Sequence, residues 1–363
     1  MAKTIGQLLG LPALTEAVNE TLSGLPQEKF LPAAFKNLTQ EVIGNSVLAV
    51  LLKGQRKVSK LVKYGAPPVG APLETIADQS WILYASSENI PIDPITFQNL
   101  RAYDSWELQR KGEMEIGRQI GLFVKKQMNL QSTITMMQLN KGLTYWDVNG
   151  NLLPSSSGAF ETIGSIGISA NNQNQCNGLI DTTWANPNAN IPLMVRKIKK
   201  QCLFDTGYEL EQAMYGQNVP TYIQKNSYCM DYLARDPSMR SKFLTTNEIP
   251  DGFLDLKWVP AWKAFYEDYT ETNRQIMDSD GVTFYPEPSR DWYELDLGST
   301  YVPKTLNVIP DVDAMMSNLE TKYGIYSYGH INMMPVSLTI VSGNVFLPNI
   351  KNPGVLFQAI VAF

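Results

Sequence analysis

A helical repeat of apolar positions dominates the middle of the chain. Residues 95–153 contain no proline, and apolar side chains recur there at helical spacing. These positions are Ile116, Ile120, Phe123, Leu130, Ile134 and Met137. Glu107 and Lys111 add a supporting pair one turn apart, and Asn140-Lys141-Gly142 is a C-terminal cap signal. The pattern predicts one helix at about 103–141, far longer than the average of ~11–12 residues.

Two apolar segments around a proline- and glycine-rich tip predict a protruding β-hairpin before this helix. NSVLAVLL (45–52) begins the first strand, GAPPVGAP (65–72) cannot continue a ladder, and SWILYAS (80–86) returns as the second strand. The hairpin is basic at Lys53, Arg56, Lys57, Lys60 and Lys63. Because a two-stranded ribbon is poorly stable alone, we expect it to dock on a partner; a solvated hairpin is the alternative.

Residues 1–46 have the pattern of an arm. A short helix is broken by Pro12 and ends near Gly24. LPQEKFLPAAF (25–35) then places two Leu-Pro steps around a phenylalanine, which favours extended chain. Such an arm either straps its own domain or packs on a neighbour.

Shorter elements follow the long helix. Asn149-Gly150 predicts a hairpin turn, and apolar positions predict a second helix at 190–203 that continues past Gly207 toward Met214. GQNVPTYIQKN (216–226) predicts a turn and a short apolar strand, with another helix starting at Asn226 or Ser227.

Turns and strands are predicted for the last third of the chain. SDGVTFYPEP (279–288) has a hairpin signal that leads into a strand. The β-branched end of the chain, 333–363, predicts a strand that is buried in a sheet.

Composition narrows the function classes. The chain has 363 residues, 44% of them hydrophobic, and a net charge of −5, which disfavours broad nucleic-acid binding. Cys176, Cys202 and Cys229 are odd in number and form no CxxC pair, so we expect reduced thiols that serve as small core residues. The N-terminus lacks a signal-peptide core, and no run reaches the ~20 apolar residues of a membrane span. We expect a soluble protein that is not secreted.

The sequence offers no catalytic, cofactor or metal motif. His330 is the only histidine, which excludes multi-histidine metal sites, and its surroundings contain no nucleophile motif. A phosphate-binding P-loop is missing. Asp278-Ser279-Asp280-Gly281 is interpreted as a turn, since the remaining ligands of a calcium loop are missing. We therefore predict that the chain is not an enzyme and has no cofactor.

One alternative rests on aromatic and acidic residues, because carbohydrate-processing sites combine carboxylates with aromatic platforms. The residues are Trp258, Trp262, Tyr266, Glu267, Asp268, Asp291, Trp292, Tyr293 and Glu294. The same residue types also mark protein interfaces. A carbohydrate-binding or carbohydrate-hydrolysing protein is thus a distant alternative.

Taken in order, these landmarks resemble a known family. IDTTWANPNANIP (180–192) is similar to a Trp-then-Asn-Pro entry to a helix, GQNVPTYIQKN (216–226) to a Gly–x–x–Pro–Thr stretch, and IPDGFLDLKW (249–258) to a Pro-Asp-Gly segment. Together with the arm, hairpin and long helix, they resemble the major capsid proteins of tailed phages, particularly the lambda-type (E-type) family.

The resemblance implies an α+β fold with five parts. These are an N-terminal arm (1–46), an extended loop with flanking strands (47–92), a peripheral domain with the spine helix at about 103–141 (93–204), an axial domain (205–320) and C-terminal return strands (321–363).

The resemblance also implies partners. Identical copies would form hexamers and pentamers of an icosahedral shell in the virion, assembled in the host cytoplasm and enclosing double-stranded DNA without sequence-specific binding. Decoration, scaffolding and portal proteins are further expected partners. The hairpin would reach over a neighbouring subunit and bring Lys53, Arg56, Lys57, Lys60 and Lys63 toward Glu113 and Glu115 of its spine helix.

Two alternatives stay open within this resemblance. An encapsulin-like nanocompartment shell shares the fold. Some relatives cross-link a loop lysine to an asparagine, for which Lys60 or Lys63 and Asn349 or Asn352 are the candidates, although no motif supports a cross-link.

Overall fold

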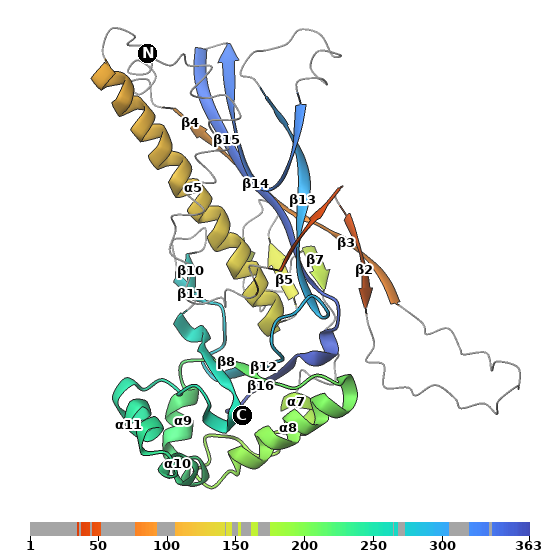
Figure 1. The fold of residues 1–363 in the computed structure, drawn as a ribbon, viewed down its shortest axis with the longest axis vertical. Helices are drawn as coiled ribbons and strands as arrows, with labels where there is room; N and C mark the ends of the chain where they lie inside the picture. Colours follow the sequence, from red (N-terminus) through yellow and green to blue (C-terminus); the bar gives the residue numbers. More distant parts are fainter. Residues whose placement is uncertain are drawn as a thin grey trace, which may run out of the picture.

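The computed structural model defines the fold over most of the chain. It describes residues 35, 38–43, 46–51, 77–92, 106–141, 143–146, 152–153, 161–165, 175–263, 265–267, 273–304, 319–333 and 336–363. The described elements form two lobes, called here the upper and lower lobes after their places in Figure 1.

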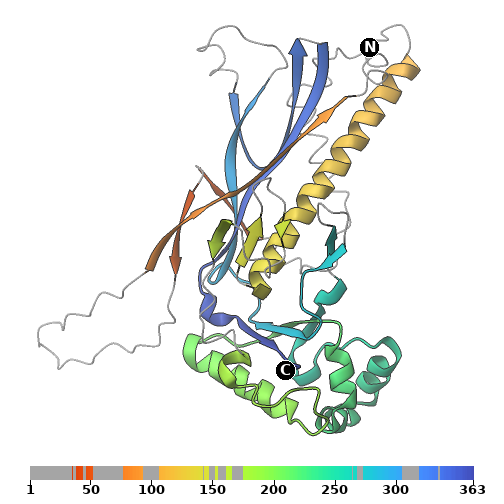
Figure 2. The ribbon, with the colours of Figure 1, turned by 180° about the vertical axis from the view of Figure 1, so that it is seen from behind.

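The upper lobe is built on a five-stranded sheet in the order β1-β13-β14-β15-β4. Its strands are β1 (Thr39–Val42), β4 (Tyr84–Pro91), β13 (Tyr293–Pro303), β14 (Leu319–Met333) and β15 (Val336–Ile350). All pairings are antiparallel except that of β1 with β13. The two long strands β14 and β15 run the length of this lobe (Figures 1 and 2).

Helix α5 (Trp106–Lys141) lies along this sheet and contacts β15. Its 36 residues correspond to about 54 Å. In its first half, apolar residues such as Ile116, Ile120 and Val124 are buried, while the opposite face is exposed. The stretch 132–139 is buried throughout. The predicted long helix is therefore confirmed.

Two small sheets flank the upper lobe. β2 (Ser46–Leu51) pairs antiparallel with β3 (Ala77–Ile82), which confirms the two strands of the predicted hairpin; its tip lies outside the described residues. β5 (Leu143–Trp146) pairs with β6 (Leu152–Leu153) and with β7 (Glu161–Ser165). The predicted Asn149-Gly150 turn falls between β5 and β6, outside the described residues.

The lower lobe combines a four-stranded sheet, in the order β16-β12-β8-β9, with a group of helices. The strands are β8 (Gln212–Tyr215), β9 (Lys257–Pro260), β12 (Gly281–Tyr285) and β16 (Phe357–Ile360). The α-helices are α7 (Gln175–Gly178), α8 (Ile191–Thr206), α9 (Val219–Lys225), α10 (Ser227–Ala234) and α11 (Pro237–Thr246). Shorter elements are η1 (Phe253–Asp255), η2 (Ala261–Lys263), β10 (Phe265–Glu267), β11 (Asn273–Gln275) and η3 (Pro353–Val355). Figure 1 places α8 and α11 on opposite flanks of this lobe.

The chain has two hydrophobic cores among its described residues: an upper core, which extends from the upper sheet to Met214 of β8 and Tyr285 of β12, and a lower core. The upper core includes Phe35, Trp292 and Phe346, and the lower core includes Trp184, Tyr215 and the buried face of α8. Cys176, Cys202 and Cys229 are buried free thiols of the lower core, which confirms their predicted role as small core residues. None of the described helices is both long and apolar enough to cross a membrane.

The structure corrects the prediction for residues 216–226. The expected short strand is helix α9, because Asn218 occupies its N-cap position and Pro220 lies in its first turn, where proline's missing N–H costs nothing. The expected continuation of the second helix is also wrong. Gly207 adopts a left-handed conformation (φ 85°) and ends α8, after which the chain enters β8. The helix predicted to begin at Asn226 or Ser227 is confirmed as α10.

The prediction of a hairpin at residues 279–288 is also wrong, although the turn and the strand that it contains are both present. A turn does precede β12, with the Gly281 amide donating to the Asp278 carbonyl at 2.9 Å. However, β12 pairs with β8 and β16, which come from distant parts of the chain. The C-terminal segment is in sheets as predicted: β15 in the upper lobe and β16 in the lower.

Candidate structural joint and assembly surface

The stretch 216–218 is hydrogen-bonded to the turn that precedes β12. The Gly216 amide donates to the Gly281 carbonyl at 2.9 Å, and the Asn218 amide donates to the Ser279 carbonyl at 2.9 Å. A Cβ on Gly216 would lie only 2.2 Å from the Asp278 carbonyl oxygen. Glycine is therefore required here because two backbone segments touch.

Asp280 connects this turn to α9 and to the C-terminus. Its carboxylate accepts from Asn218 Nδ2 at 2.9 Å and from the Tyr222 hydroxyl at 2.7 Å. This acceptor raises the pKa of Tyr222. The Asp280 carbonyl accepts from the Val361 amide, and the Val361 carbonyl accepts from the Trp184 amide, both at 2.8 Å. One acidic side chain and its backbone thus hold three distant segments together.

Asn226 performs a second joining role at the boundary between α9 and α10. It is fully buried, and its Oδ1 caps α10 by accepting from the Cys229 amide at 3.0 Å. Its Nδ2 donates to the Ala189 carbonyl at 2.7 Å, and the next amide, that of Ser227, donates to the Pro187 carbonyl. The segments 180–192 and 216–226 are therefore in direct contact.

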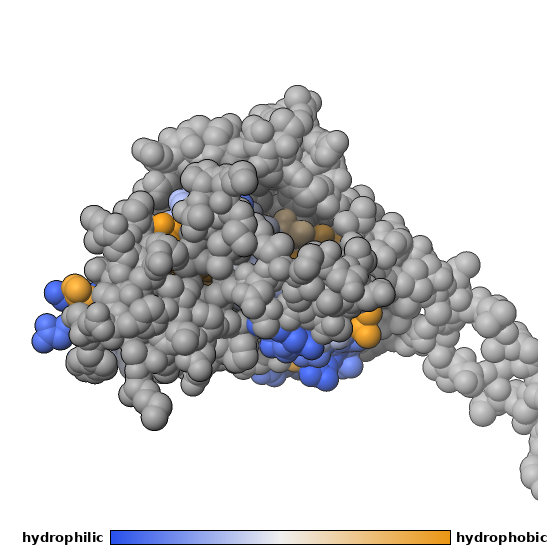
Figure 3. Space-filling model, turned by 90° about the horizontal axis from the view of Figure 1, so that it is seen from above, coloured by the Kyte–Doolittle hydropathy of each residue, from blue (hydrophilic) through white to orange (hydrophobic). Residues whose placement is uncertain are grey.

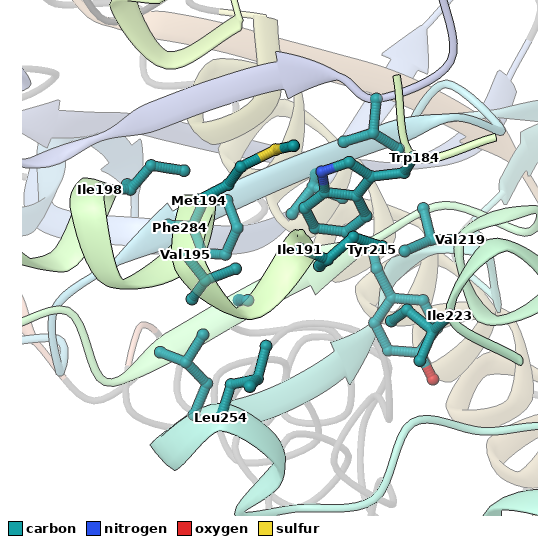
Figure 4. Close-up of a cluster of buried hydrophobic side chains, with 14 of the residues drawn as sticks. Trp184, Ile191, Met194, Val195, Ile198, Tyr215, Val219, Ile223, Leu254 and Phe284 are labelled. Atoms are coloured by element: carbon teal, nitrogen blue, oxygen red, sulfur yellow. The ribbon is translucent and has the colours of Figure 1, made fainter. Parts of the chain in front are cut away.

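The third segment quoted for the resemblance joins the same core. Trp258 is buried and donates through Nε1 to the Phe253 carbonyl at 2.8 Å. The Ile249 amide donates to the Tyr215 hydroxyl, and burial raises the pKa of Tyr215 to about 12. The Tyr215 and Trp258 rings lie 6.0 Å apart, edge to face. Figure 4 shows Trp184 and Tyr215 entering this core from different segments.

These contacts define the joint of the lower lobe, meaning residues 180–192, 216–226, 249–258 and 278–281. The hydrogen bonds of Gly216, Asn218, Asn226, Asp280 and Trp258 all position backbone, so the joint fixes geometry. The sequence alone indicated that 180–192, 216–226 and 249–258 were notable. It did not indicate the contact with 278–281, which depends on the β8–β12 pairing.

The described thiols are protonated, and the described acidic groups form no metal site. Burial raises the pKa of Cys202 to about 11 and that of Cys229 to about 12, which keeps both protonated and unreactive. In the part of the chain that the structure describes, no group of three or more His, Cys, Asp or Glu side chains is arranged to hold a metal ion. His330 lies on β14, opposite Thr339 of β15.

Among the described residues of the carbohydrate alternative, the aromatic side chains of Trp258 and Trp292 do not belong to one platform. Trp258 is buried in the lower core, whereas Trp292 and Tyr293 are buried in the upper core. Glu294 is also buried and pairs with Lys351 at 2.5 Å. The side chains of residues 266–268 lie outside the described part of the structure. The geometry therefore gives this alternative no support.

The predicted assembly residues are only partly described. Lys53, Arg56, Lys57, Lys60 and Lys63 lie outside the described residues. Glu113 is on α5. Glu115, also on α5, accepts from Arg118 Nε at 2.8 Å, from Arg118 Nη2 at 2.6 Å and from Gln119 Nε2 at 2.7 Å. The Arg118 and Gln119 hydrogen bonds lower the pKa of Glu115 to about 2, so this carboxylate is charged and already partnered within its own helix.

The exposed face of α5 is mixed in character. Met114 is 65% exposed and Leu122 is 51% exposed, and Lys111, Arg118 and Lys125 are exposed on the same helix. Seen from above, the coloured surface shows hydrophilic patches and separate hydrophobic residues (Figure 3). Such a face offers both apolar and charged contacts.

The asparagines considered for cross-linking are engaged within the chain. Asn349 is buried and its Nδ2 donates to Asp296 Oδ2 at 3.0 Å. Asn352 is also buried, and its side chain accepts from the Gly354 amide at 3.2 Å. The lysines of that hypothesis lie outside the described residues.

Comparisons with known proteins identify the fold. No protein-family model matches the sequence, and no curated protein matches it. Among solved structures, a protein of E. coli CFT073 that is assigned as a prophage capsid protein is 11% identical, with 98% of this chain and 99% of that chain covered and a TM-score of 0.53.

Two further solved structures match at lower similarity. A phage-related protein of Bordetella bronchiseptica RB50 is 9% identical over 98% of each chain, with a TM-score of 0.45. The SrpI encapsulin of Synechococcus elongatus PCC 7942 is 8% identical over 95% of this chain and 94% of that chain, with a TM-score of 0.41.

The E. coli match covers both lobes and the long helix in one alignment. The chain therefore has the α+β fold of phage capsid proteins, and the fold class predicted from the sequence is confirmed.

Proposed function

We propose that this chain is the major capsid protein of a tailed phage, and that identical copies assemble into the icosahedral shell around the phage genome. The observation that carries the proposal is the fold, which matches a protein assigned as a prophage capsid protein over 98% of this chain. The order of the sequence landmarks supports the same assignment independently of the fold.

The shape of the molecule supports a subunit that works through contacts with copies of itself. The hairpin β2–β3 stands away from the two lobes, and α5 has one face exposed along its first half (Figures 1 and 2). In this proposal the upper lobe is the peripheral domain and the lower lobe is the axial domain. Helix α8 then belongs to the axial domain and not to the part predicted as peripheral (93–204), and β13 belongs to the peripheral domain and not to the part predicted as axial (205–320). The joint then keeps the lower lobe in one conformation, in which it contacts its neighbours in hexamers and pentamers.

The negative net charge supports a role in enclosing DNA without binding it tightly. The net charge of −5 opposes tight binding to phosphates, so packed DNA stays releasable. We assign the chain to the virion capsid, with assembly in the host cytoplasm and with decoration, scaffolding and portal proteins as further partners. The role is structural and not enzymatic.

The hairpin lysines are proposed to contact the spine helix of a neighbouring subunit. Because Glu115 already holds Arg118, a lysine from a neighbour would join an existing ion pair. Exposed ion pairs contribute only ~0.2–1 kcal/mol each. Shell stability must then come from many contacts, including apolar ones such as Met114 and Leu122.

Sedimentation velocity with negative-stain microscopy tests the proposal. The protein is expressed alone and together with the products of its neighbouring genes. We expect closed shells, or capsomers of five and six copies, from a subunit of 40.6 kDa. A single monomer peak under every condition, scaffold and portal included, would contradict the proposal.

The contents of purified shells separate a virion from a nanocompartment. A phage capsid is expected to hold double-stranded DNA that resists nuclease until the shell is opened. Shells that instead carry one abundant enzyme and no DNA would assign the chain to an encapsulin-like compartment.

A further inference from the structure

A buried polar seam crosses the contact between α5 and the upper sheet. Gln127 of α5 is 1% exposed, and its Nε2 donates to the Ser86 hydroxyl of β4 at 3.2 Å. Ser86 is directly opposite Asn344 of β15, so their side chains lie on the same face of the sheet, about 5 Å apart at Cβ. Gln127, Ser86 and Asn344 are called the seam below.

Three polar atoms in the seam lack hydrogen-bond partners. Asn344 is 0% exposed, and neither its Nδ2 nor its Oδ1 is bonded; Gln127 Oε1 is unbonded too. Folded proteins satisfy roughly 90% or more of their buried polar groups, because an unsatisfied one loses its bonds to water without replacement. An unsatisfied donor, Asn344 Nδ2, and an unsatisfied acceptor, Gln127 Oε1, next to the same serine therefore call for a shared partner.

The neighbouring polar groups do not supply that partner. Ser327 Oγ and Ser342 Oγ are 2.9 Å apart, and Ser342 Oγ donates to the Tyr326 carbonyl at 3.1 Å, so that pair is satisfied within the sheet. Lys126 and Glu88 pair with each other at 2.7 Å; Lys126 is exposed and Glu88 is partly exposed to solvent. These neighbours are therefore not available to the seam, which itself contains only neutral side chains.

We propose that the seam binds an internal water molecule that accepts a hydrogen bond from Asn344 Nδ2 and donates one to Gln127 Oε1. Water is the ligand of choice because the seam needs both a donor and an acceptor and carries no charge. Internal waters typically make two to four such bonds to buried polar groups. This water links helix to sheet and fixes the position of α5 on β15. The inference does not depend on the proposed function.

The direct test is an experimental map of the full-length protein, at a resolution that shows ordered water. We expect a density peak within hydrogen-bonding distance, about 2.7–3.2 Å, of both Asn344 and Gln127. A well-ordered seam with no peak, in which the two amides bond to each other or to other groups, would overturn the proposal.

A double-mutant cycle tests the shared ligand in solution. Asn344→Leu and Gln127→Leu are each expected to lower the urea midpoint of unfolding, since each leaves the other amide and the water with an open bond. The double variant needs no water, so its midpoint should be no lower than that of the milder single variant. Strictly additive losses, or a raised midpoint for Asn344→Leu alone, would contradict a shared water.

Asn226→Leu provides the matched control. Asn226 is equally buried but has protein partners for both amide atoms, and it belongs to the lower core. When Asn226→Leu is combined with Gln127→Leu, the decreases in the urea midpoint should add. If the control double variant instead had a urea midpoint no lower than that of its milder single variant, the cycle would not report on the seam.

Discussion

Among single residues, Asp296 is the clearest case of a group whose state depends on pH. It lies on β13, is 1% exposed, and accepts from Asn349 Nδ2. Burial, with a smaller contribution from Glu294, raises its pKa from 3.8 to about 6. Its protonated form therefore contributes stability in full below the unfolded pKa, and this contribution is lost as the pH rises through about 6.

Asp296→Asn is expected to remove this pH dependence. Relative to the natural chain, the variant should gain about 2 kcal/mol in free energy of unfolding between pH 4.5 and pH 7.5, as the buried carboxyl no longer ionises. Urea unfolding at the two pH values measures the difference. The exposed Asp231→Asn is the control, and an equal gain there, or none for Asp296→Asn, would contradict the assignment.

Two glycines are expected to respond to alanine in opposite directions. At Gly216 a Cβ would meet the Asp278 and Ser279 carbonyl oxygens at 2.2 and 2.4 Å, so Gly216→Ala should destabilise by at least about 2 kcal/mol. At Gly117, on the exposed face of α5, nothing lies within 4 Å, and Gly117→Ala should stabilise by about 0.5–1 kcal/mol. Thermal and urea unfolding of both variants check the signs; a tolerated Gly216→Ala would mean that the joint is not closely packed.

Among the helices and strands, α5 was predictable because its signal is local. Its apolar positions repeat over many turns, no proline interrupts them, and a cap signal ends them. Helix α9 was not predictable in the same way, since its seven residues carry too few repeats to distinguish helix from strand. Its conformation is set by contacts with 278–281, which are distant in sequence.

Asn226 gives a prediction about the joint between two helices. Asn226→Ala removes both the cap of α10 and the bond to the Ala189 carbonyl, and it leaves buried backbone groups unpaired. The loss in free energy of unfolding should be about 2–3 kcal/mol. Asn218→Ala, which removes the exposed side-chain bond to Asp280, should cost about 0.5–1 kcal/mol. Equal effects in urea unfolding would show that Asn226 has no special joining role.

For the molecule as a whole, the sequence showed the order of elements but not their division between two cores. Trp258 and Trp292 looked like parts of one cluster, yet they lie in different lobes. β16 is separated from β15 by only a short turn, yet it completes the lower sheet. Such assignments depend on pairings between distant segments, which no local pattern records.

The basic hairpin provides a prediction at the level of assembly. Lys57→Glu, Lys60→Glu and Lys63→Glu combined should leave the subunit folded, because the sequence predicts an exposed, charged hairpin at these positions. The triple variant should reduce the yield of shells at least tenfold, as measured by sedimentation. Lys197→Glu with Lys200→Glu, on the exposed face of α8, is the control for a general effect of added negative charge. An unchanged yield of shells would show that the hairpin lysines do not contribute to assembly.

Cryo-electron microscopy of particles from the expressed protein tests the central claim most directly. The account predicts a closed lattice of pentamers and hexamers in which every subunit has this two-lobed fold, with its β2–β3 hairpin lying over a neighbouring subunit. Particles built from another chain, or a protein that stays a 40.6 kDa monomer with all its partners supplied, would contradict it.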